Sequence, residues 1–279
     1  MVGIVFRELM EGKSKQMNFE KKEKYTISDL LKIVEILRAP DGCPWDREQT
    51  HESIRKNFIE ETYEAVEAID LGDPILLKEE LGDVLLQVAL HAQMEKECGM
   101  FDFSDVVNGI CKKLIERHPH IFSDVIAKTS EEVLKNWDDI KMRTKKQQTQ
   151  SEAMNSVSRA LPSLMRAGKV QSKAAKVGFD FLSTKSAIEK VFEEISELQK
   201  AVERDSKEAC EEELGDLLFS VVNVSRFLKL DPEQALFQAS DKFIKRFQQM
   251  EQLISWEGKK ISALSGQELD IYWNRAKEK

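Results

Sequence analysis

The chain has 279 residues, about twice the length at which single domains are commonest, so length alone favours two domains. Hydrophobic residues make up 41% and charged residues 33%, with only 12 glycines and 6 prolines. This composition is typical of a packed, helix-rich protein and excludes collagen-like, disordered and small disulfide-stapled classes. The 50 acidic residues exceed the 42 basic ones and give a net charge of −8, which argues against a nucleic acid polymer as partner. An anion could still bind through a metal ion.

Cysteine usage and hydropathy indicate a cytoplasmic protein. The four cysteines form no C-x-x-C pair, so neither a zinc ribbon nor a thioredoxin-type site is expected. No stretch reaches the roughly 18 apolar residues of a membrane span, and the N-terminus becomes charged too early for a signal-peptide core. We therefore expect no membrane partner, and an N-terminal extension over residues 1–26.

The first expected helix begins at Ser28 and ends before Pro40, because apolar residues recur between them at helical spacing. A second helix is expected over 52–70. A third follows from Pro74, with Asp73 as its N-cap. Because the connection is so short, these two helices should form a tight antiparallel hairpin.

A second hairpin is expected over 186–204 and 207–229, with Asp205 and Glu208 forming a capping box at the start of its second helix. The other segments with helical periodicity are 104–117, 130–145, 232–254 and 266–278. No segment alternates as a half-buried strand would, so the predicted fold class is all-α.

The chain contains two copies of one unit. Aligned with itself at an offset of 133 residues, it brings 59–70 onto 192–203 and 79–88 onto 212–221, with the same acids at the same spacing. A Lys-x-x-x-Arg motif and a Trp-x-x-x-Lys motif then follow in the same order in both copies. The period is far longer than that of a solenoid repeat, so the pattern predicts a duplicated domain.

Apolar residues nearly vanish between the two copies, which predicts an exposed linker over 147–153. The expected N-terminal domain is 27–146 and the expected C-terminal domain is 154–279.

Each predicted hairpin places carboxylates on facing turns. On its second helix two acids stand three residues apart and share one face, and apolar residues surround them, so this helix is expected to be buried centrally. With a rise of ~1.5 Å per residue, Glu64 and Glu80 both lie about 12 Å from the hairpin apex. Acids of the two helices should therefore meet.

Ionised carboxylates crowded onto buried helices repel one another and would protonate or destabilise the fold without a compensating cation. Oxygen ligation that leaves positions for water and phosphate is typical of Mg²⁺, with Mn²⁺ as a possible substitute. An isolated pair of acids at this spacing more often belongs to an exposed helix face. Two equally spaced copies in apolar surroundings favour a metal site.

These motifs together resemble the MazG family of nucleoside triphosphate pyrophosphohydrolases in its two-domain form. The similar elements are GCPWDREQTHES (42–53), E-E-x-x-E followed by E-L-G-D in both units, ERHPHIF (116–122), GFDF (178–181) and KFIKRF (242–247). The resemblance covers about residues 28–279. It implies tandem MazG-like helical bundles, a homodimer, and Mg²⁺-dependent hydrolysis of an NTP or dNTP to the monophosphate and pyrophosphate.

The resemblance also implies roles for residues at the matching positions. The implied metal ligands are Glu194, Glu197, Glu213 and Asp216 in the C-terminal unit, and Glu61, Glu64, Glu80 and Asp83 in the N-terminal unit. The implied nucleotide contacts of the C-terminal unit are Lys190, Lys242, Arg246, Trp273 and Lys277. Those of the N-terminal unit are Lys113, Arg117, Trp137 and Lys141. Asn57 replaces Lys190 in the N-terminal unit. In this family the C-terminal unit is commonly the active one, so the resemblance favours it here.

The expected reaction is in-line attack of water on the α-phosphorus. Glu193, and Glu60 in the N-terminal unit, stand about 100° around the helix from the adjacent ligand, so we expect each to support a metal ligand or to orient the attacking water as a base, and not to bind the metal itself. An alternative is a nucleotide-sensing or interaction module that binds Mg-nucleotide without turnover. Two further alternatives stay open: core packing for the tryptophans, and di-iron chemistry at the E-x-x-H motif of Glu48 and His51.

Overall fold

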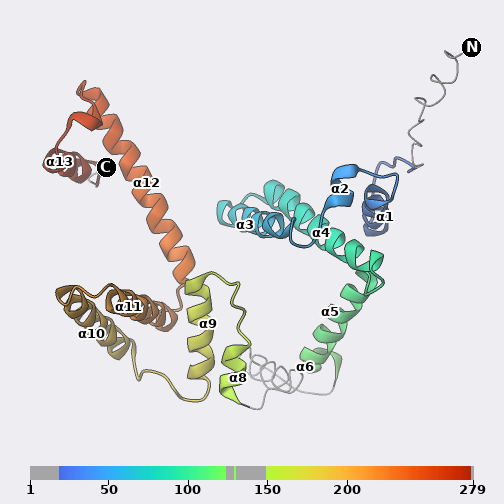
Figure 1. Cartoon of the computed structure of the whole chain (residues 1–279), viewed down its shortest axis with the longest axis horizontal. Coiled ribbons are helices and arrows are strands. Elements are labelled where there is room, and N and C mark those ends of the chain that lie inside the picture. The colour runs from blue at the N-terminus through green and yellow to red at the C-terminus, as the bar shows by residue number, and fades with distance from the viewer. Residues whose placement is uncertain (1–18, 124–128, 130–148, 278–279) are drawn as a thin grey trace, which may run out of the picture. The chain divides into compact units, whose positions relative to one another are not determined.

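The computed structural model describes residues 19–123, 129 and 149–277, and the chain divides into two units, Met1–Trp137 and Asp138–Lys279 (Figure 1). The described residues form helices and no strand, which confirms the all-α class. In this part of the chain no helix is both long and apolar enough to cross a bilayer. The domain borders expected from the sequence stay a prediction, and the helix expected over 130–145 lies outside the described residues.

Unit 1 is built around one helical hairpin. Its helices are α1 (Ile27–Arg38), α2 (Pro44–Glu48), α3 (Arg55–Leu71), α4 (Pro74–Glu97), α5 (Phe103–Arg117) and α6 (Pro119–Phe122). Gly72 ends α3 in the left-handed conformation, at φ 65°, and Asp73 caps α4 as expected. α1 packs against α4, where Val34 and Leu90 form the core.

Unit 2 repeats this hairpin and adds a separate helical arm. Its elements are α8 (Gln150–Asn155), α9 (Ser163–Ala175), α10 (Thr184–Glu203), α11 (Lys207–Phe227), α12 (Pro232–Trp256), the 3-10 helix η1 (Ile261–Ala263) and α13 (Gly266–Lys277). α10 and α11 form the hairpin, and α9 packs against α11. α12 projects away from the hairpin and carries α13, with which it forms its own core around Ile254 and Tyr272 (Figure 1).

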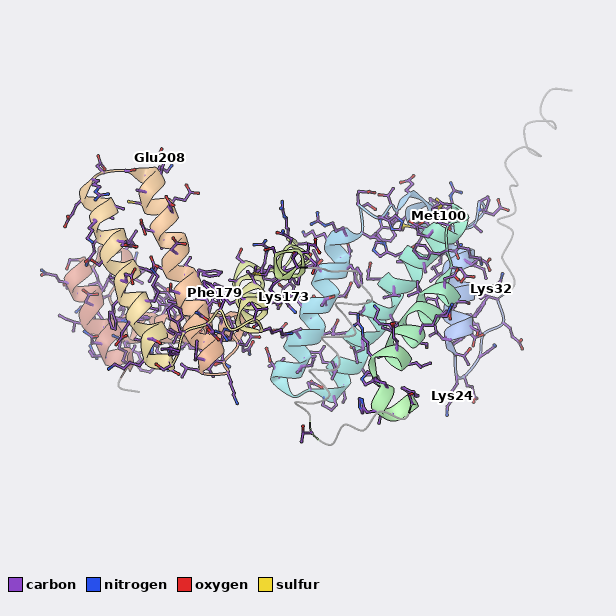
Figure 2. All side chains as sticks on the ribbon, turned by 90° about the horizontal axis from the view of Figure 1, so that it is seen from below. Lys24, Lys32, Met100, Lys173, Phe179 and Glu208 are labelled. Atoms are coloured by element: carbon purple, nitrogen blue, oxygen red, sulfur yellow. The ribbon has the colours of Figure 1, made fainter. Side chains whose placement is uncertain are left out.

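The capping box expected at Asp205 is wrong. Asp205 takes a left-handed conformation, at φ 51°, and the next residue, Ser206, caps α11 by accepting from the backbone N–H of Ala209. The tight turn of this hairpin needs one residue with positive φ, and Asp205 fills that position. Figure 2 shows the turn, with Glu208 beside it.

The expectation that the second hairpin helix is buried centrally is also wrong for much of its length. Leu214, Leu218 and Val221 of α11 are 47–49% exposed, and Phe192 of α10 is 66% exposed. In unit 1, Leu81 of α4 is likewise exposed. Each hairpin therefore presents exposed apolar side chains at its surface.

Candidate active site

Three carboxylates of unit 2 meet between α10 and α11. One oxygen from each of Glu194, Glu213 and Asp216 lies within 4.8 Å of the others. Glu194 is only 3% exposed, Glu213 is half-buried and Asp216 is exposed. Burial is the larger cause that raises the pKa of Glu213, followed by the negative charge of Glu197, so Glu197 belongs electrostatically to the same site.

One lysine compensates part of this negative charge. Lys190 Nζ donates to Glu194 Oε1 at 2.7 Å and to Glu193 Oε1 at 2.8 Å. These contacts raise the pKa of Lys190. Glu193 has a largely exposed side chain and lies outside the three-carboxylate cluster. The lysine therefore links a buried member of the cluster to the neighbouring solvent-facing carboxylate.

Unit 1 holds a second cluster, formed by Glu61, Glu64 and Glu80, again with one oxygen from each within 4.8 Å of the others. Burial first, and then the charge of Asp83, raise the pKa of Glu61. Burial, and then the negative charge of Glu64, raise the pKa of Glu80. Glu60 is exposed and lies outside the cluster.

The chemistry of both clusters fits a hard divalent cation. Carboxylate oxygens are the only donors in each, which suits Mg²⁺ or Mn²⁺ better than zinc or copper. In the described ranges no other group of three potential ligands comes as close together. His51 belongs to neither cluster, so the structure lends no support to a di-iron site.

The expected nucleotide-binding cations gather elsewhere. Lys242, Arg246 and Lys277 line a cavity of about 470 Å³ between α12 and α13, and the acids of the α10–α11 cluster do not line it. Trp273 packs on Phe243, with 4.9 Å between ring centroids. Within one chain these basic side chains therefore lie on the α12–α13 arm, whereas the acidic side chains lie on the α10–α11 hairpin.

The nucleotide contacts expected in unit 1 are only partly visible. Lys113 is exposed and Arg117 is half-buried, and both lie on α5, which packs against α4. Trp137 and Lys141 lie outside the described residues.

A cavity of about 680 Å³ adjoins the unit 2 cluster, and sequence reasoning missed its amide lining. Lys190, Glu194 and Asp216 line this cavity together with Gln171, Phe179, Phe219, Asn223 and Arg226. Figure 2 places Phe179 at the end of the unit away from Glu208. The cavity therefore extends from the acids to the GFDF segment.

The two amides in this cavity have fixed orientations. Asn223 Oδ1 accepts from Arg226 Nε at 3.0 Å, and because a guanidinium only donates, the Asn223 nitrogen is left as a donor. Gln171 Nε2 donates to the carbonyl of Phe219 at 2.7 Å, while its buried Oε1 has no hydrogen-bond partner among the described residues. Arg226 also pairs with Asp180, which ties the GFDF segment to α11. Asn223, a polar residue on an apolar helix, was the signal that could have revealed this lining.

Both hairpins fall within matches to one known domain. The family model of the MazG nucleotide pyrophosphohydrolase domain matches residues 49–122 and 182–250. The chain belongs to the MazG family. Each match to the MazG domain contains one complete acidic hairpin, α3–α4 in the first and α10–α11 in the second.

Two named relatives align with most of the chain, and a third aligns with about half of it. A Thermotoga maritima protein named nucleoside triphosphate pyrophosphohydrolase/pyrophosphatase MazG is 46% identical over 90% of this chain and 95% of its own. An Escherichia coli protein named nucleoside triphosphate pyrophosphohydrolase is 42% identical over 90% of this chain and 97% of its own. A Mycobacterium tuberculosis protein with the same name is 35% identical over 54% of this chain and 46% of its own.

We predict that Glu213→Gln stabilises the metal-free chain near neutral pH. The raised pKa of Glu213 means that the folded state holds its proton to a higher pH than the unfolded state, so this carboxyl costs stability as pH rises above its ordinary value of 4.5. Thermal unfolding in EDTA should show a higher midpoint for the variant, and a smaller loss of stability between about pH 5 and pH 8.

Glu211→Gln is the matched control, because Glu211 is exposed on the same helix and lies outside the cluster. It should leave the unfolding midpoint unchanged. Equal midpoints for Glu213→Gln and the wild type would contradict charge crowding in this cluster.

Proposed function

We propose that the chain hydrolyses NTPs and dNTPs to their monophosphates and pyrophosphate in a Mg²⁺-dependent reaction that clears unwanted nucleotides from the cellular pool. The observation that carries this proposal is that Glu194 and Asp216 of the acidic cluster line a cavity of about 680 Å³, a size that suits a small-molecule ligand. Membership of the MazG family and the names of the relatives support the class of reaction.

In this proposal Glu194, Glu197, Glu213 and Asp216 hold Mg²⁺, or Mn²⁺ in its place. The bound metal would supply positive charge against the triphosphate and lower the pKa of a coordinated water. Glu193 orients the attacking water and accepts its proton, and Lys190 holds the Glu193 carboxylate in place.

Water attacks the α-phosphorus, the bond between the α-phosphorus and the bridging α–β oxygen breaks, and pyrophosphate leaves with the electron pair on that oxygen. Lys242 and Arg246 bind the leaving pyrophosphate, and Trp273 and Lys277 help to hold the nucleotide. The nucleoside lies in the cavity, where Phe219 offers an apolar wall and Asn223 a hydrogen-bond donor.

We propose that the protein acts as a homodimer in which the α12–α13 arm of one copy reaches the acidic cluster of the other. Two observations support this arrangement. Within one chain Lys242 and Arg246 line a different cavity from that of Glu194. The hairpin also leaves Phe192 and Leu218 exposed, as expected of a face that a second copy covers.

A second candidate function, nucleotide sensing without turnover, applies to unit 1. Its cluster lacks the lysine of unit 2, since Asn57 stands at the position of Lys190. Leu90 likewise stands at the position of Asn223. Unit 1 therefore retains acids that suit a metal, but it lacks the lysine that we assign to holding the catalytic carboxylate and the amide that we assign to the substrate.

We place this activity in the cytoplasm, because all four cysteines are free thiols, as in a reducing compartment. Nucleic acid polymers are not proposed as partners, since the net charge of −8 would repel them.

The reaction is tested by identifying the products from a panel of NTPs and dNTPs with Mg²⁺. We expect the monophosphate and pyrophosphate, and Glu197→Gln should lower kcat/KM by about 100-fold or more, as expected for loss of a metal ligand or its close neighbour. Glu64→Gln, at the equivalent position of unit 1, should retain most of the activity. A diphosphate and phosphate as products, or unimpaired turnover by Glu197→Gln, would contradict the proposal.

The dimer arrangement is tested by mixing two inactive variants, Glu197→Gln and Arg246→Ala. If acids and cations come from different copies, each mixed dimer contains one intact site. A mixture with random assortment then recovers roughly a quarter of the wild-type activity. If both sets of residues act within one chain, the mixture stays inactive.

A further inference from the structure

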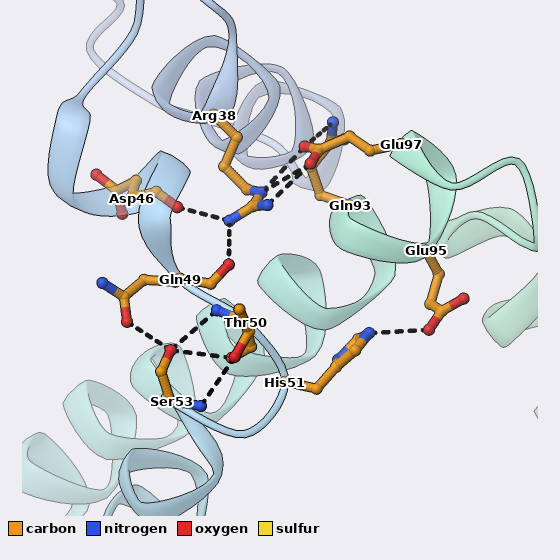
Figure 3. Close-up of polar contacts among 9 residues, drawn as sticks. All are labelled: Arg38, Asp46, Gln49, Thr50, His51, Ser53, Gln93, Glu95 and Glu97. Atoms are coloured by element: carbon orange, nitrogen blue, oxygen red, sulfur yellow. Dashed lines mark hydrogen bonds and ion pairs between the residues drawn. The ribbon is translucent and has the colours of Figure 1, made fainter.

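Two histidines of unit 1, neither of them part of the acidic cluster, face each other at hydrogen-bond distance. The Nδ1 atoms of His51 and His91 are 2.6 Å apart, and the rings are stacked with an interplanar angle of 3°. The other nitrogen of His51, Nε2, lies 2.8 Å from Glu95 Oε1. Figure 3 shows that His51 comes from the loop before α3, whereas Glu95 lies on α4.

The stretch just before His51 is attached to the same end of α4 by a different group. The guanidinium of Arg38 donates to the backbone carbonyls of Asp46 at 2.5 Å and Gln49 at 3.1 Å, and pairs with Glu97 at 2.8 Å (Figure 3). Arginine keeps its charge over the whole physiological range. Residues 46–49 are therefore held by Arg38, whose charge does not change with pH in this range. His51 is instead held by the ionisable side chains of His91 and Glu95.

Few other charges face the histidine pair. Glu95 contacts it from α4, and Glu52, in the same loop as His51, is the other carboxylate that interacts with it electrostatically. From α3 the neighbour is the uncharged ring of Phe58, whose centroid is 5.6 Å from that of His91. From α1 and α2, Arg38 and Asp46 take part in the separate network around Gln49 and Glu97.

This geometry limits the number of protons on the pair. When both rings are neutral, His51 donates from Nε2 to Glu95 and accepts at Nδ1 from His91. One added proton makes His51 cationic and reverses the bond between the rings, so every contact is still satisfied. A second added proton puts hydrogen on both Nδ1 atoms, which then repel each other while two positive charges stack.

We propose that His51, His91 and Glu95 form a proton-operated clip, which holds the loop of residues 50–54 against α4 at neutral pH and releases it when both imidazoles are protonated. Burial, and then the proximity of His51, lower the pKa of His91 below its ordinary value of 6.5. Below that value the released loop binds more protons than the clipped one. The clip is therefore stable above about pH 6.5 and weakens as pH falls.

The release has a defined structural consequence. Ile54, at the end of this loop, is 2% exposed and belongs to the core of unit 1. α3 begins at the next residue and carries Glu61 and Glu64. Opening the clip loosens the start of the helix that supplies two of the three carboxylates of the unit 1 cluster. A fall in pH therefore affects this hairpin even when no nucleotide is bound.

Hydrogen exchange of the full chain tests the clip, because the backbone N–H groups of Ser53 and Ile54 are hydrogen-bonded within the loop. After correction for intrinsic exchange, their protection in the wild type should fall about tenfold for each pH unit below the ordinary imidazole pKa. The N–H of Gln49, on the part held by Arg38, should keep its protection.

His91→Phe keeps a stacking ring but cannot take a proton, so the fall in protection at Ser53 and Ile54 should disappear. His118→Gln removes a histidine that interacts with the carbonyl of Leu114 instead, and it should behave as the wild type. The proposal would be overturned if the protection of these N–H groups fell as much in His91→Phe as in the wild type. It would also be overturned if their protection fell in neither protein.

Ring NMR on the wild-type chain gives an independent measurement should His91→Phe fail to fold. The ring of His91 should titrate below the ordinary imidazole midpoint of 6.5. Titration of His91 at the ordinary midpoint would also overturn the proposal.

Discussion

The repulsion among carboxylates at the facing turns of each hairpin is the constraint on which the structure depends. Burial and neighbouring charges raise the pKa values of Glu61, Glu80 and Glu213, which shows that the fold holds these acids where ionisation is unfavourable. Lys190 relieves part of this charge in unit 2, and Asn57 cannot do so in unit 1. A divalent cation would reduce this repulsion in both units. A triphosphate would then bind through the same ion, because its phosphate oxygens are ligands for it.

Unit 2 keeps its acidic and basic candidate site residues on different elements. The acids lie on the α10–α11 hairpin and Lys242 and Arg246 lie on the α12–α13 arm, in separate cavities. In the proposed dimer a second copy would bring the two sets of charges together, and the exposed apolar side chains of the hairpin, such as Phe192, fit a face that this copy would cover.

Much of the fold could be predicted from the sequence, because helix periodicity and caps such as Asp73 are local signals. The spacing of the acids placed Glu64 opposite Glu80, and these two side chains do meet, since both helices of a hairpin run from one short turn. Asp83 and Glu197, which the same spacing also expected to face a partner, lie outside the two clusters. The burial of α11 could not be predicted, because it depends on what packs against Leu214 and Leu218. The orientation of Asn223 depends on Arg226 and Asp180, and the contact between His51 and His91 joins residues 40 positions apart. Neither arrangement leaves a periodic signal.

The most direct test of the account is the thermal unfolding of the metal-free chain as Mg²⁺ is added, compared with NaCl at equal ionic strength. The account predicts that Mg²⁺ raises the unfolding midpoint in a saturable way and that NaCl has little effect, because the ion binds the carboxylate clusters specifically. Equal effects of the two salts, or no effect of Mg²⁺, would contradict the claim that a divalent cation relieves the repulsion.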